Sequence, residues 1–316
     1  MLNGLDREKE TAMGILQYEL GMTPIEMRRF TNGYCHRVYY VKTASGEFVL
    51  RVTGEENKEY YLGSVEWLPK LGALGVPVPR ILKHGAYRED FYTLISFLPG
   101  KDLGEVYHTL TGEEKRGIVR ELTIIQRKAA ALPSMERYGY PHAGHGGSFA
   151  AWTGYLESSV ARSCERIRQN GVFRDDVCDA VTGIMRTLED YFASVKPTPF
   201  LDDSTTKNVL IHEGKLSGIV DVDEMCCGDP LLVVGLTNMA LLSMGADNDY
   251  TGFWLDEMNA GETQRKAVTF YTLLFCVDFM GEQGMRFVNG AAVSHDEKKA
   301  ALLNARYHEL IQKLSF

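Results

Sequence analysis

The sequence lacks several features that would assign it to a class of protein by themselves. None of the six cysteines, in 316 residues, belongs to a C-x-x-C pair or to a Cys/His zinc spacing. There is no run of about 18 or more apolar residues, so we expect neither a membrane-spanning helix nor a membrane partner. The opening stretch MLNGLDREKE contains no apolar core and is not expected to be a signal peptide. We therefore predict a cytoplasmic protein whose thiols are reduced.

Net positive charge is also lacking. The chain carries 34 lysines and arginines against 42 acidic residues, which gives a formal charge of −8. A nucleic-acid partner requires a basic face, so none is expected. The content of 45% hydrophobic and 24% charged residues is typical of a globular protein with ample core material. An acidic chain suits neutral or cationic small partners, although solubility explains the same charge.

Strand patterns dominate the N-terminal third of the chain. Residues 38–52, VYYVKTASGEFVLRV, contain two β-branched and aromatic runs around a turn, which is a hairpin signature. A short helix is expected near Ser64–Leu74, because Gly63 and Pro69 interrupt the helical pattern around it. A buried strand is then expected to end at Pro99–Gly100.

Helical periodicity takes over further along the chain. Apolar residues recur at helical spacing over residues 113–132, 175–195 and 265–279. A short β-rich island, NVLIHEGKLSGIVDVD at 208–223, lies between them with a turn at 213–215. These patterns predict an α+β protein with a small antiparallel β-rich lobe over residues 1–97 and a larger, mainly helical lobe over residues 98–316.

A group of oxygen-bearing side chains surrounds the predicted hairpin of the island. Asp203 and Asn208 flank the step into its first strand, and Asp221 ends its second strand. Because a tight hairpin brings the start of one strand beside the end of the next, Asn208 and Asp221 are expected to lie close together, within reach of Asp203. Two carboxylates and one amide suit Mg²⁺ beside substrate phosphates, with one carboxylate left to orient a hydroxyl. Alternatively, Asn208 and Asp221 are ordinary turn residues.

The order of the motifs carries a resemblance. Leu201-Asp202-Asp203 leads to Asn208, and Ile219-Val220-Asp221 and Gly228-Asp229-Pro230 follow. This order is similar to the H-G-D-x-x-x-x-N, I-D-aromatic and G-D-P motifs of the aminoglycoside phosphotransferase and choline kinase-like family, small-molecule relatives of the protein kinases. Upstream, TNGYCHRVYYVKTASGEFVLRV, LGALGVPVPRIL and LISFLPGKDL resemble the nucleotide-covering hairpin, the exit from the first helix and the hinge of that family.

The resemblance implies a protein-kinase-like two-lobe fold and a small-molecule kinase. Such an enzyme would transfer phosphate from ATP, or alternatively GTP, to a hydroxyl group with the help of Mg²⁺. Asp203 would be the catalytic base, and Asn208 and Asp221 would hold the metal. Arg51 would pair with the nucleotide phosphates where the kinases have lysine, keeping the charge on a planar group.

Further nucleotide contacts are implied in the same way. Gly33 would belong to the loop over the nucleotide. Glu66 would be the helix glutamate that pairs with Arg51, with Glu59 as the alternative. Backbone groups of the hinge would meet the adenine edge; these belong to Ser96, Phe97 and Leu98. Asp229 is expected to brace the catalytic loop.

The sequence departs from the family pattern around the base. Leu201 replaces the histidine and Asp202 the glycine, so the loop is either supported by leucine packing or less well positioned. Asp202 is expected to point away from Asp203, solvated or capping, or else to face a cationic substrate. Asp223 projects to the same side as Asp221 in an extended chain, and is either an outer ligand of the metal or a surface residue.

Three functions remain open on the sequence. The first is a kinase of a small-molecule hydroxyl, with aminoglycosides, choline-like amines, amino-alcohols and sugars as candidate acceptors. The second is a protein kinase or binding module, against which the lack of an A-P-E segment counts. The third is a catalytically weak or inactive nucleotide-binding protein, suggested by Leu201 and opposed by the presence of Asp203, Asn208, Asp221 and Arg51.

The identity of the acceptor is the least constrained point. Acidic residues of the helical lobe suit either a cationic acceptor or the solvated faces of helices; they are Asp247, Asp249, Glu257, Asp278 and Glu282. Both a monomer and a dimer are compatible with the sequence.

Overall fold

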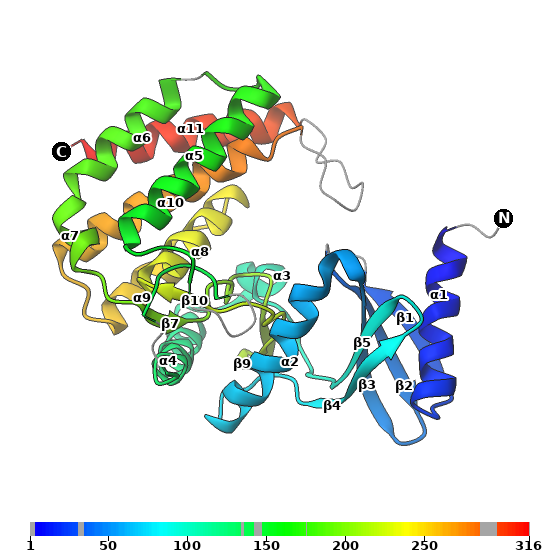
Figure 1. Ribbon diagram of the computed structural model, residues 1–316. Coiled ribbons are helices and arrows are strands. Elements are labelled where there is room, and N and C mark those ends of the chain that lie inside the picture. Colours follow the sequence, from blue (N-terminus) through cyan, green and yellow to red (C-terminus); the bar gives the residue numbers. More distant parts are fainter. Residues whose placement is uncertain are drawn as a thin grey trace. The chain divides into compact units, whose positions relative to one another are not determined.

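The computed structural model describes residues 4–30, 35–133, 136–141, 147–174, 176–284 and 296–315. The described chain divides into two compact units (Figure 1). The first contains Met1–Pro99 and Ser217–Glu224, and the second contains Gly100–Leu216 and Met225–Phe316. The second lobe was expected to be continuous from residue 98, whereas the structure assigns residues 217–224 to the first unit.

A five-stranded antiparallel sheet forms the centre of the first unit, in the order β1-β2-β3-β5-β4. Its strands are β1 (Glu26–Phe30), β2 (Arg37–Thr43), β3 (Gly46–Gly54), β4 (Ile81–Tyr87) and β5 (Asp90–Ser96). The hairpin predicted over 38–52 is confirmed as β2 and β3, which pair from Arg37 opposite Val52 to Thr43 opposite Gly46. The predicted buried strand is β5.

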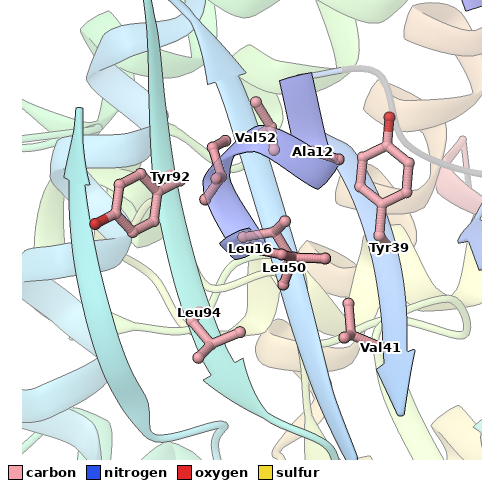
Figure 2. Packing of buried hydrophobic residues seen from close by; sticks show 9 residues of the cluster. Ala12, Leu16, Tyr39, Val41, Leu50, Val52, Tyr92 and Leu94 are labelled. Atoms are coloured by element: carbon pink, nitrogen blue, oxygen red, sulfur yellow. The ribbon is translucent and has the colours of Figure 1, made fainter. Parts of the chain in front are cut away.

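One face of this sheet is covered by the N-terminal helix. Helix α1 (Gly4–Gly14) and the π-helical turn η1 (Ile15–Glu19) place Ala12, Ile15 and Leu16 against side chains of three strands. Figure 2 shows Leu16 beside Leu50, with Val52 and Tyr39 nearby. Successive side chains of a strand point to opposite faces, so Arg51 and Thr53 of β3 project away from this apolar layer.

Helix α2 (Lys58–Ala73), which follows the 3₁₀ turn η2 (Glu55–Asn57), is longer than expected. The prediction of a helix starting near Ser64 was too short, because the helix runs through both Gly63 and Pro69. Its buried residues are Tyr61, Ser64, Trp67, Leu68 and Leu71. They recur every three or four positions, so tertiary packing of one face outweighs the low helix propensity of glycine and proline.

Two glycines let residues 217–224 join the first unit. The N–H of Ile219 donates to the carbonyl of Pro77 at 2.9 Å. A Cβ at Gly218 would lie 2.7 Å from that carbonyl oxygen, and a Cβ at Gly63 would lie 1.8 Å from the carbonyl oxygen of Asp223. Only glycine allows the backbones to approach so closely at these positions.

The second unit is mainly helical, and α10 packs against α5, α8 and α11 within it. Its helices are α3 (Leu103–Val106), η3 (Tyr107–Thr109), α4 (Gly112–Ala129), α5 (Trp152–Asn170), α6 (Asp176–Thr187), α7 (Glu189–Ser194), α8 (Leu231–Ser243), α9 (Asp249–Glu257), α10 (Glu262–Gly281) and α11 (Glu297–Leu314). The predicted helical segments correspond to α4, to α6 with α7, and to α10.

Short strands carry the motif-bearing loops of the second unit. Strand β6 (Lys101–Asp102) pairs with β8 (Val209–His212), and β7 (Thr198–Phe200) pairs with β10 (Cys226–Gly228). Strand β9 (Lys215–Ile219), whose residues from Ser217 on belong to the first unit, follows β8 after a tight turn in which Glu213 and Gly214 have φ values of 51° and 74°. Positive φ at both central residues is the signature of a type I′ hairpin turn.

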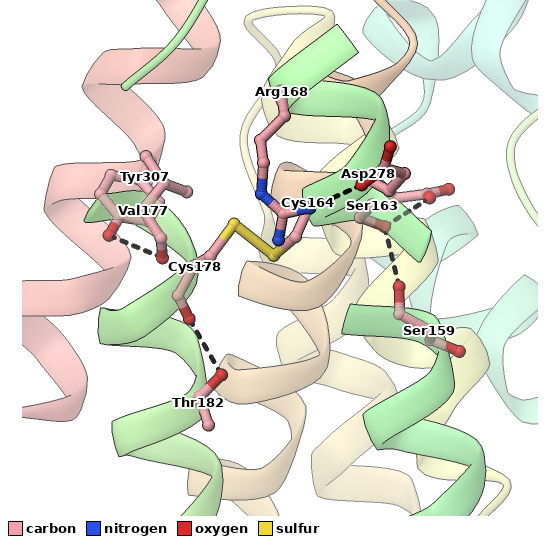
Figure 3. The surroundings of a disulfide bond; sticks show 10 residues. Ser159, Ser163, Cys164, Arg168, Val177, Cys178, Thr182, Asp278 and Tyr307 are labelled. Carbon is pink, nitrogen blue, oxygen red and sulfur yellow. Dashed lines mark hydrogen bonds and ion pairs between the residues drawn. A yellow bond between two sulfur atoms is a disulfide. The ribbon is translucent and has the colours of Figure 1, made fainter. Parts of the chain in front are cut away.

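A disulfide joins α5 to α6 through Cys164 and Cys178, whose Cα atoms lie 5.9 Å apart (Figure 3). The prediction of reduced thiols throughout is therefore wrong for this pair. The two cysteines are separated by 14 positions without any recognised motif, and only the packing of the two helices brings them together. Among the described residues, Cys35, Cys226, Cys227 and Cys276 form no disulfide. None of the described helices has both the length and the apolar character needed to cross a bilayer.

Candidate active site

Asp203 and Asn208 are held together by a small hydrogen-bonded loop in the second unit. The Asn208 side-chain amide donates to the backbone carbonyl of Asp203 at 2.9 Å and to its Oδ2 at 2.8 Å. Thr205 Oγ1 donates to Asp203 Oδ1 at 3.0 Å. Asp203 is exposed and Asn208 is buried. The D-x-x-x-x-N spacing thus folds into a loop that fixes an exposed carboxylate.

The same loop is clamped by a residue that sequence reasoning missed. Gln126 of α4 donates from Nε2 to the carbonyl of Leu201 and to Ser204 Oγ, both at 2.8 Å. Its Oε1 accepts from the N–H of Leu201 at 3.0 Å. Leu201 itself is 2% exposed and packs in the core. The loop therefore has both apolar packing and a side-chain clamp in the region where the family has histidine.

Asp202 has a partner in the second unit, since its carboxylate accepts a hydrogen bond from the Tyr140 hydroxyl. Burial, followed by the negative charge of Asp202, raises the pKa of Tyr140 well above its usual value. This contact holds Asp202 in place through a neutral hydroxyl donor. Asp202 is therefore not simply solvated, which was one of the alternatives left open on the sequence.

Arg51 lies at the centre of a charged cluster in the first unit. Its guanidinium nitrogen Nη2 donates to Asp223 Oδ2 at 2.5 Å and to Asp221 Oδ1 at 3.0 Å. Arg51 and Asp223 are 4% and 8% exposed, whereas the Asp221 side chain is 54% exposed. Asp223 is therefore buried in an ion pair with Arg51, which excludes the surface position that was one of its two alternatives on the sequence.

A histidine completes this cluster. His36, just before β2, places Nε2 2.7 Å from Asp223 Oδ2 and Nδ1 2.7 Å from Thr53 Oγ1. Although burial opposes the change, Arg51 and His36 hold the pKa of Asp223 well below its usual range. Asp223 is thus the permanently charged carboxylate of the cluster.

Arg51 is not held by the helix glutamate that we expected. Glu66 accepts a hydrogen bond from Lys70, one turn along α2, at 2.7 Å. Among the described residues no ion pair joins Arg51 to Glu66 or to Glu59. The nearby lysine gives Glu66 a local partner, and Asp223 supplies the buried carboxylate for Arg51 instead.

The predicted hinge lies at the end of β5. Ser96 exchanges hydrogen bonds with Arg80, through its N–H and its hydroxyl, each at 2.9 Å. The Phe97 ring meets the Tyr40 ring edge-on at 5.3 Å between centroids, and Leu98 would contact a Cβ at Gly218. The nucleotide contacts of these three residues stay a prediction. Gly33 lies outside the described residues.

The donor atoms are compatible with a magnesium ion. One ligand atom from each of His36, Asp221 and Asp223 lies within 4.8 Å of the others, and the exposed carboxylate of Asp221 can present an oxygen to a cation. The amide nitrogen of Asn208 is engaged by Asp203, which leaves Oδ1 as its ligating atom. Both are the hard oxygen donors that Mg²⁺ prefers. Asn208 belongs to the second unit and Asp221 to the first.

Asp229 is buried in a hydrogen-bonded network of the second unit. It accepts from the hydroxyls of Tyr191 and Tyr271, both at 2.7 Å, and from the N–H of Leu231 at 3.0 Å. Strand β10, just before it, pairs with β7, which leads into the loop at Leu201. This burial and this pairing agree with a bracing role.

Three of the acidic residues considered for a cationic acceptor already have cationic partners; for Glu257 the partner is Arg120, at 4.0 Å. Asp247 accepts from Lys115 Nζ at 3.1 Å and from the Tyr107 hydroxyl at 2.8 Å. Asp278 accepts from Ser163 Oγ at 2.8 Å and from Arg166 at 3.3 Å. The carboxylates of Asp247 and Asp278 therefore stabilise packing between helices of the second unit.

The chain is similar to known proteins in both sequence and fold. The sequence model of the phosphotransferase enzyme family matches residues 26–248. A search of curated proteins finds no significant match. Among solved structures, a thermostable mutant of aminoglycoside phosphotransferase APH(4)-Ia, in a ternary complex with AMP-PNP and hygromycin B, is similar at 16% identity and a TM-score of 0.69, over 96% of this chain and 97% of that one.

Two further structures share the fold. The streptomycin-ATP complex of APH(2")-IIa is 14% identical, with a TM-score of 0.63 over 99% of this chain and 97% of that one. A candidate fructosamine-3-kinase from Haemophilus somnus 129PT is 10% identical, with a TM-score of 0.63 over 98% of both chains. At these identities the likeness establishes the fold, which is the protein-kinase-like architecture expected from the sequence.

Proposed function

The chain belongs to the phosphotransferase enzyme family, and from this premise we propose that it transfers the γ-phosphoryl group of ATP to a hydroxyl of a small molecule. The observation that carries the proposal is the loop in which Asn208 and Thr205 fix the exposed carboxylate of Asp203. Phosphoryl transfer depends mainly on positioning and on charge neutralisation, with little covalent chemistry from the protein. GTP is the alternative donor.

The residues of this chain divide the work as follows. Asp203 accepts the proton of the attacking hydroxyl, and its two hydrogen bonds orient the carboxylate for that purpose. Arg51 pairs with the nucleotide phosphates. Asn208 and Asp221 hold Mg²⁺, which supplies positive charge to the phosphates when bound. Gln126 keeps the backbone of the loop in place.

The acceptor is proposed as a class. Two of the similar structures contain the aminoglycosides hygromycin B and streptomycin, and a third is a candidate fructosamine-3-kinase. Polyhydroxylated amines and sugars are therefore the first acceptors to examine, followed by choline-like amines and amino-alcohols. A cytoplasmic location, where ATP is available, fits this activity.

The proposal is tested by an ATP-consumption screen over aminoglycosides, amino-alcohols, choline-like amines and sugars. Wild-type protein should consume ATP in an acceptor-dependent way. Asp203→Ala should lose that activity by about 10² to 10⁴-fold and still bind ATP. Asp190→Ala, which alters an exposed aspartate of α7, is the matched control and should behave as wild type.

Two outcomes would contradict the proposal. Normal turnover by Asp203→Ala would show that another group is the base. Binding of ATP without turnover of any acceptor would favour the inactive nucleotide-binding protein instead.

A further inference from the structure

We propose that Asp223, supported by His36, is the positioning residue that aims Arg51 at the nucleotide phosphates. This inference rests on the proposed function and adds to it the means by which the phosphate-binding group is held. Asp223 thereby does the work that a helix glutamate was expected to do. The evidence is the asymmetry between the two carboxylates that share Arg51.

Asp223 is the stronger of the two partners. Its contact with the guanidinium is the shorter one, at 2.5 Å against 3.0 Å for Asp221. Both members of the Arg51–Asp223 pair are buried, while the Asp221 side chain is 54% exposed. Solvent screens the attraction between a buried cation and an exposed carboxylate far more than that within a buried pair.

His36 fixes the orientation of Asp223. A carboxylate only accepts hydrogen bonds, so the neutral ring that satisfies both contacts carries its proton on Nε2, towards Asp223, and accepts at Nδ1 from the Thr53 hydroxyl. Thr53 and Arg51 lie two positions apart on β3 and project to the same face. The strand, His36 and residues 217–224 therefore form one connected network around Arg51.

The backbone of Asp223 is fixed as well as its side chain. Its carbonyl lies against Gly63 of α2, where a Cβ would come within 1.8 Å of the oxygen. Helix α2 therefore supports Asp223 through its backbone, whereas its glutamate at position 66 pairs with Lys70. The helix that was expected to hold Arg51 by an ion pair instead holds the residue that does so.

Asp221 has a second task in the proposed function, as a ligand of the cation. An oxygen that Asp221 shares with a cation attracts Arg51 less strongly, because the charge of the carboxylate is then partly neutralised. The buried pair with Asp223 remains, so the guanidinium keeps both its charge partner and its direction. Asp223 is thus the permanent anchor of Arg51, and the contact with Asp221 is the one that the cation weakens.

The test compares the affinities for ATP and for adenosine, measured by calorimetry with Mg²⁺ and without an acceptor. Asp223→Asn is close in shape and removes the charge, so Arg51 loses its counter-ion. Kd for ATP should rise about tenfold, the loss expected for one charge-assisted contact, while Kd for adenosine stays unchanged. Asp90→Asn, which alters another aspartate–arginine pair of the same sheet, with Arg37, is the matched control and should change neither value.

A purely structural role would lower both affinities together, and that result would overturn the inference. An unchanged Kd for ATP in a folded Asp223→Asn protein, or a selective loss in Glu66→Gln, would overturn it too. The pair is also tested by non-additivity: in an Arg51→Gln background, Asp223→Asn should weaken ATP binding no further.

If Asp223→Asn fails to fold, His36→Gln supplies the same test, with a smaller but still ATP-selective loss expected. An unchanged ratio of the two affinities in His36→Gln would then overturn the inference. Failure of the wild-type protein to bind ATP would instead contradict the proposed function.

Discussion

Leu201 stands where the resemblance to the family leads one to expect histidine, and Gln126 supports the backbone of the loop that carries Asp203. The glutamine meets both the N–H and the carbonyl of Leu201 and also reaches Ser204. The sequence showed the loss of histidine but could not show its replacement. Gln126 is a polar residue among the buried residues of α4, and it lies 75 positions before Leu201 in the sequence. No local sequence pattern predicts a contact over that separation.

Gln126→Ala should lower kcat by about 10 to 100-fold, because a small misplacement of the base is costly. KM for ATP should change little, since Arg51 and the hinge are untouched. The free energy of unfolding should fall by about 1–3 kcal/mol, as two backbone groups lose their partner. Gln169→Ala, an exposed glutamine of α5 that bonds only Glu165 among the described contacts, is the control for steady-state kinetics and thermal unfolding. A folded Gln126→Ala protein with wild-type kcat would show that the clamp does not position the loop.

Asp223 lies beside Asp221 for a reason other than the one expected from the sequence. Two residues apart in an extended chain, Asp221 and Asp223 should share one side. They do share Arg51, but Asp221 has φ 60° and the chain is not extended there. Aspartate tolerates this left-handed conformation better than most residues. The turn depends on contacts with Pro77 and Gly63, which lie far away in the sequence.

At the scale of elements, α2 shows that a single glycine or proline does not reliably predict the end of a helix. Gly63 and Pro69 predicted an interrupted helix, yet the helix spans Lys58–Ala73. The apolar face of α2 supplies more stability than the two residues remove. Gly63 is present because residues 217–224 approach it, and a linear sequence pattern does not contain that contact.

Gly63→Ala should therefore be destabilising, although alanine is the better helix former. The new methyl group would collide with the backbone oxygen of Asp223, and the free energy of unfolding should fall by about 1–3 kcal/mol. Gly72→Ala is the matched control in the same helix. No atom lies within 4 Å of a Cβ at that position, so it should be neutral or slightly stabilising. Chemical denaturation measures the free energy of unfolding of both variants. Equal stability of the two would contradict the close approach of Gly63 to the Asp223 carbonyl.

The disulfide is a second element-scale feature that the sequence did not reveal. It ties α5 to α6, and neighbouring bonds such as Tyr307 to the Val177 carbonyl surround it (Figure 3). The spacing of its cysteines matches no recognised motif, so no local pattern predicts the pair.

Reduction of the wild-type protein should lower the free energy of unfolding by about 3 kcal/mol, the value for a loop of this length. Cys178→Ser should show a similar loss and no further response to reductant. Thermal unfolding with and without reductant measures both. Titration of six free thiols in the native, oxidised protein would contradict the bond.

At the scale of the whole molecule, the local patterns predicted the elements and the motif order predicted the family. The alternation in β2 and β3 and the helical spacing in α4 and α10 are properties of short segments, so they can be recognised without the fold. The assignment of residues 217–224 to the first unit depends on Pro77 and Gly63, and the partners of Arg51 follow from it. Arg51 and Asp221, which the motif order singled out separately, lie in one cluster, whereas Glu66, the expected partner of Arg51, pairs with Lys70.

The central claim is that this chain phosphorylates a small-molecule hydroxyl with Asp203 as the base. Mass spectrometry of the acceptor after incubation with ATP and Mg²⁺ tests it most directly, over the acceptor panel given above. The account predicts a phosphorylated product with the wild-type protein and none with Asp203→Ala under the same conditions. The same product from Asp203→Ala, or no phosphorylated acceptor from a wild-type protein that binds ATP, would contradict it.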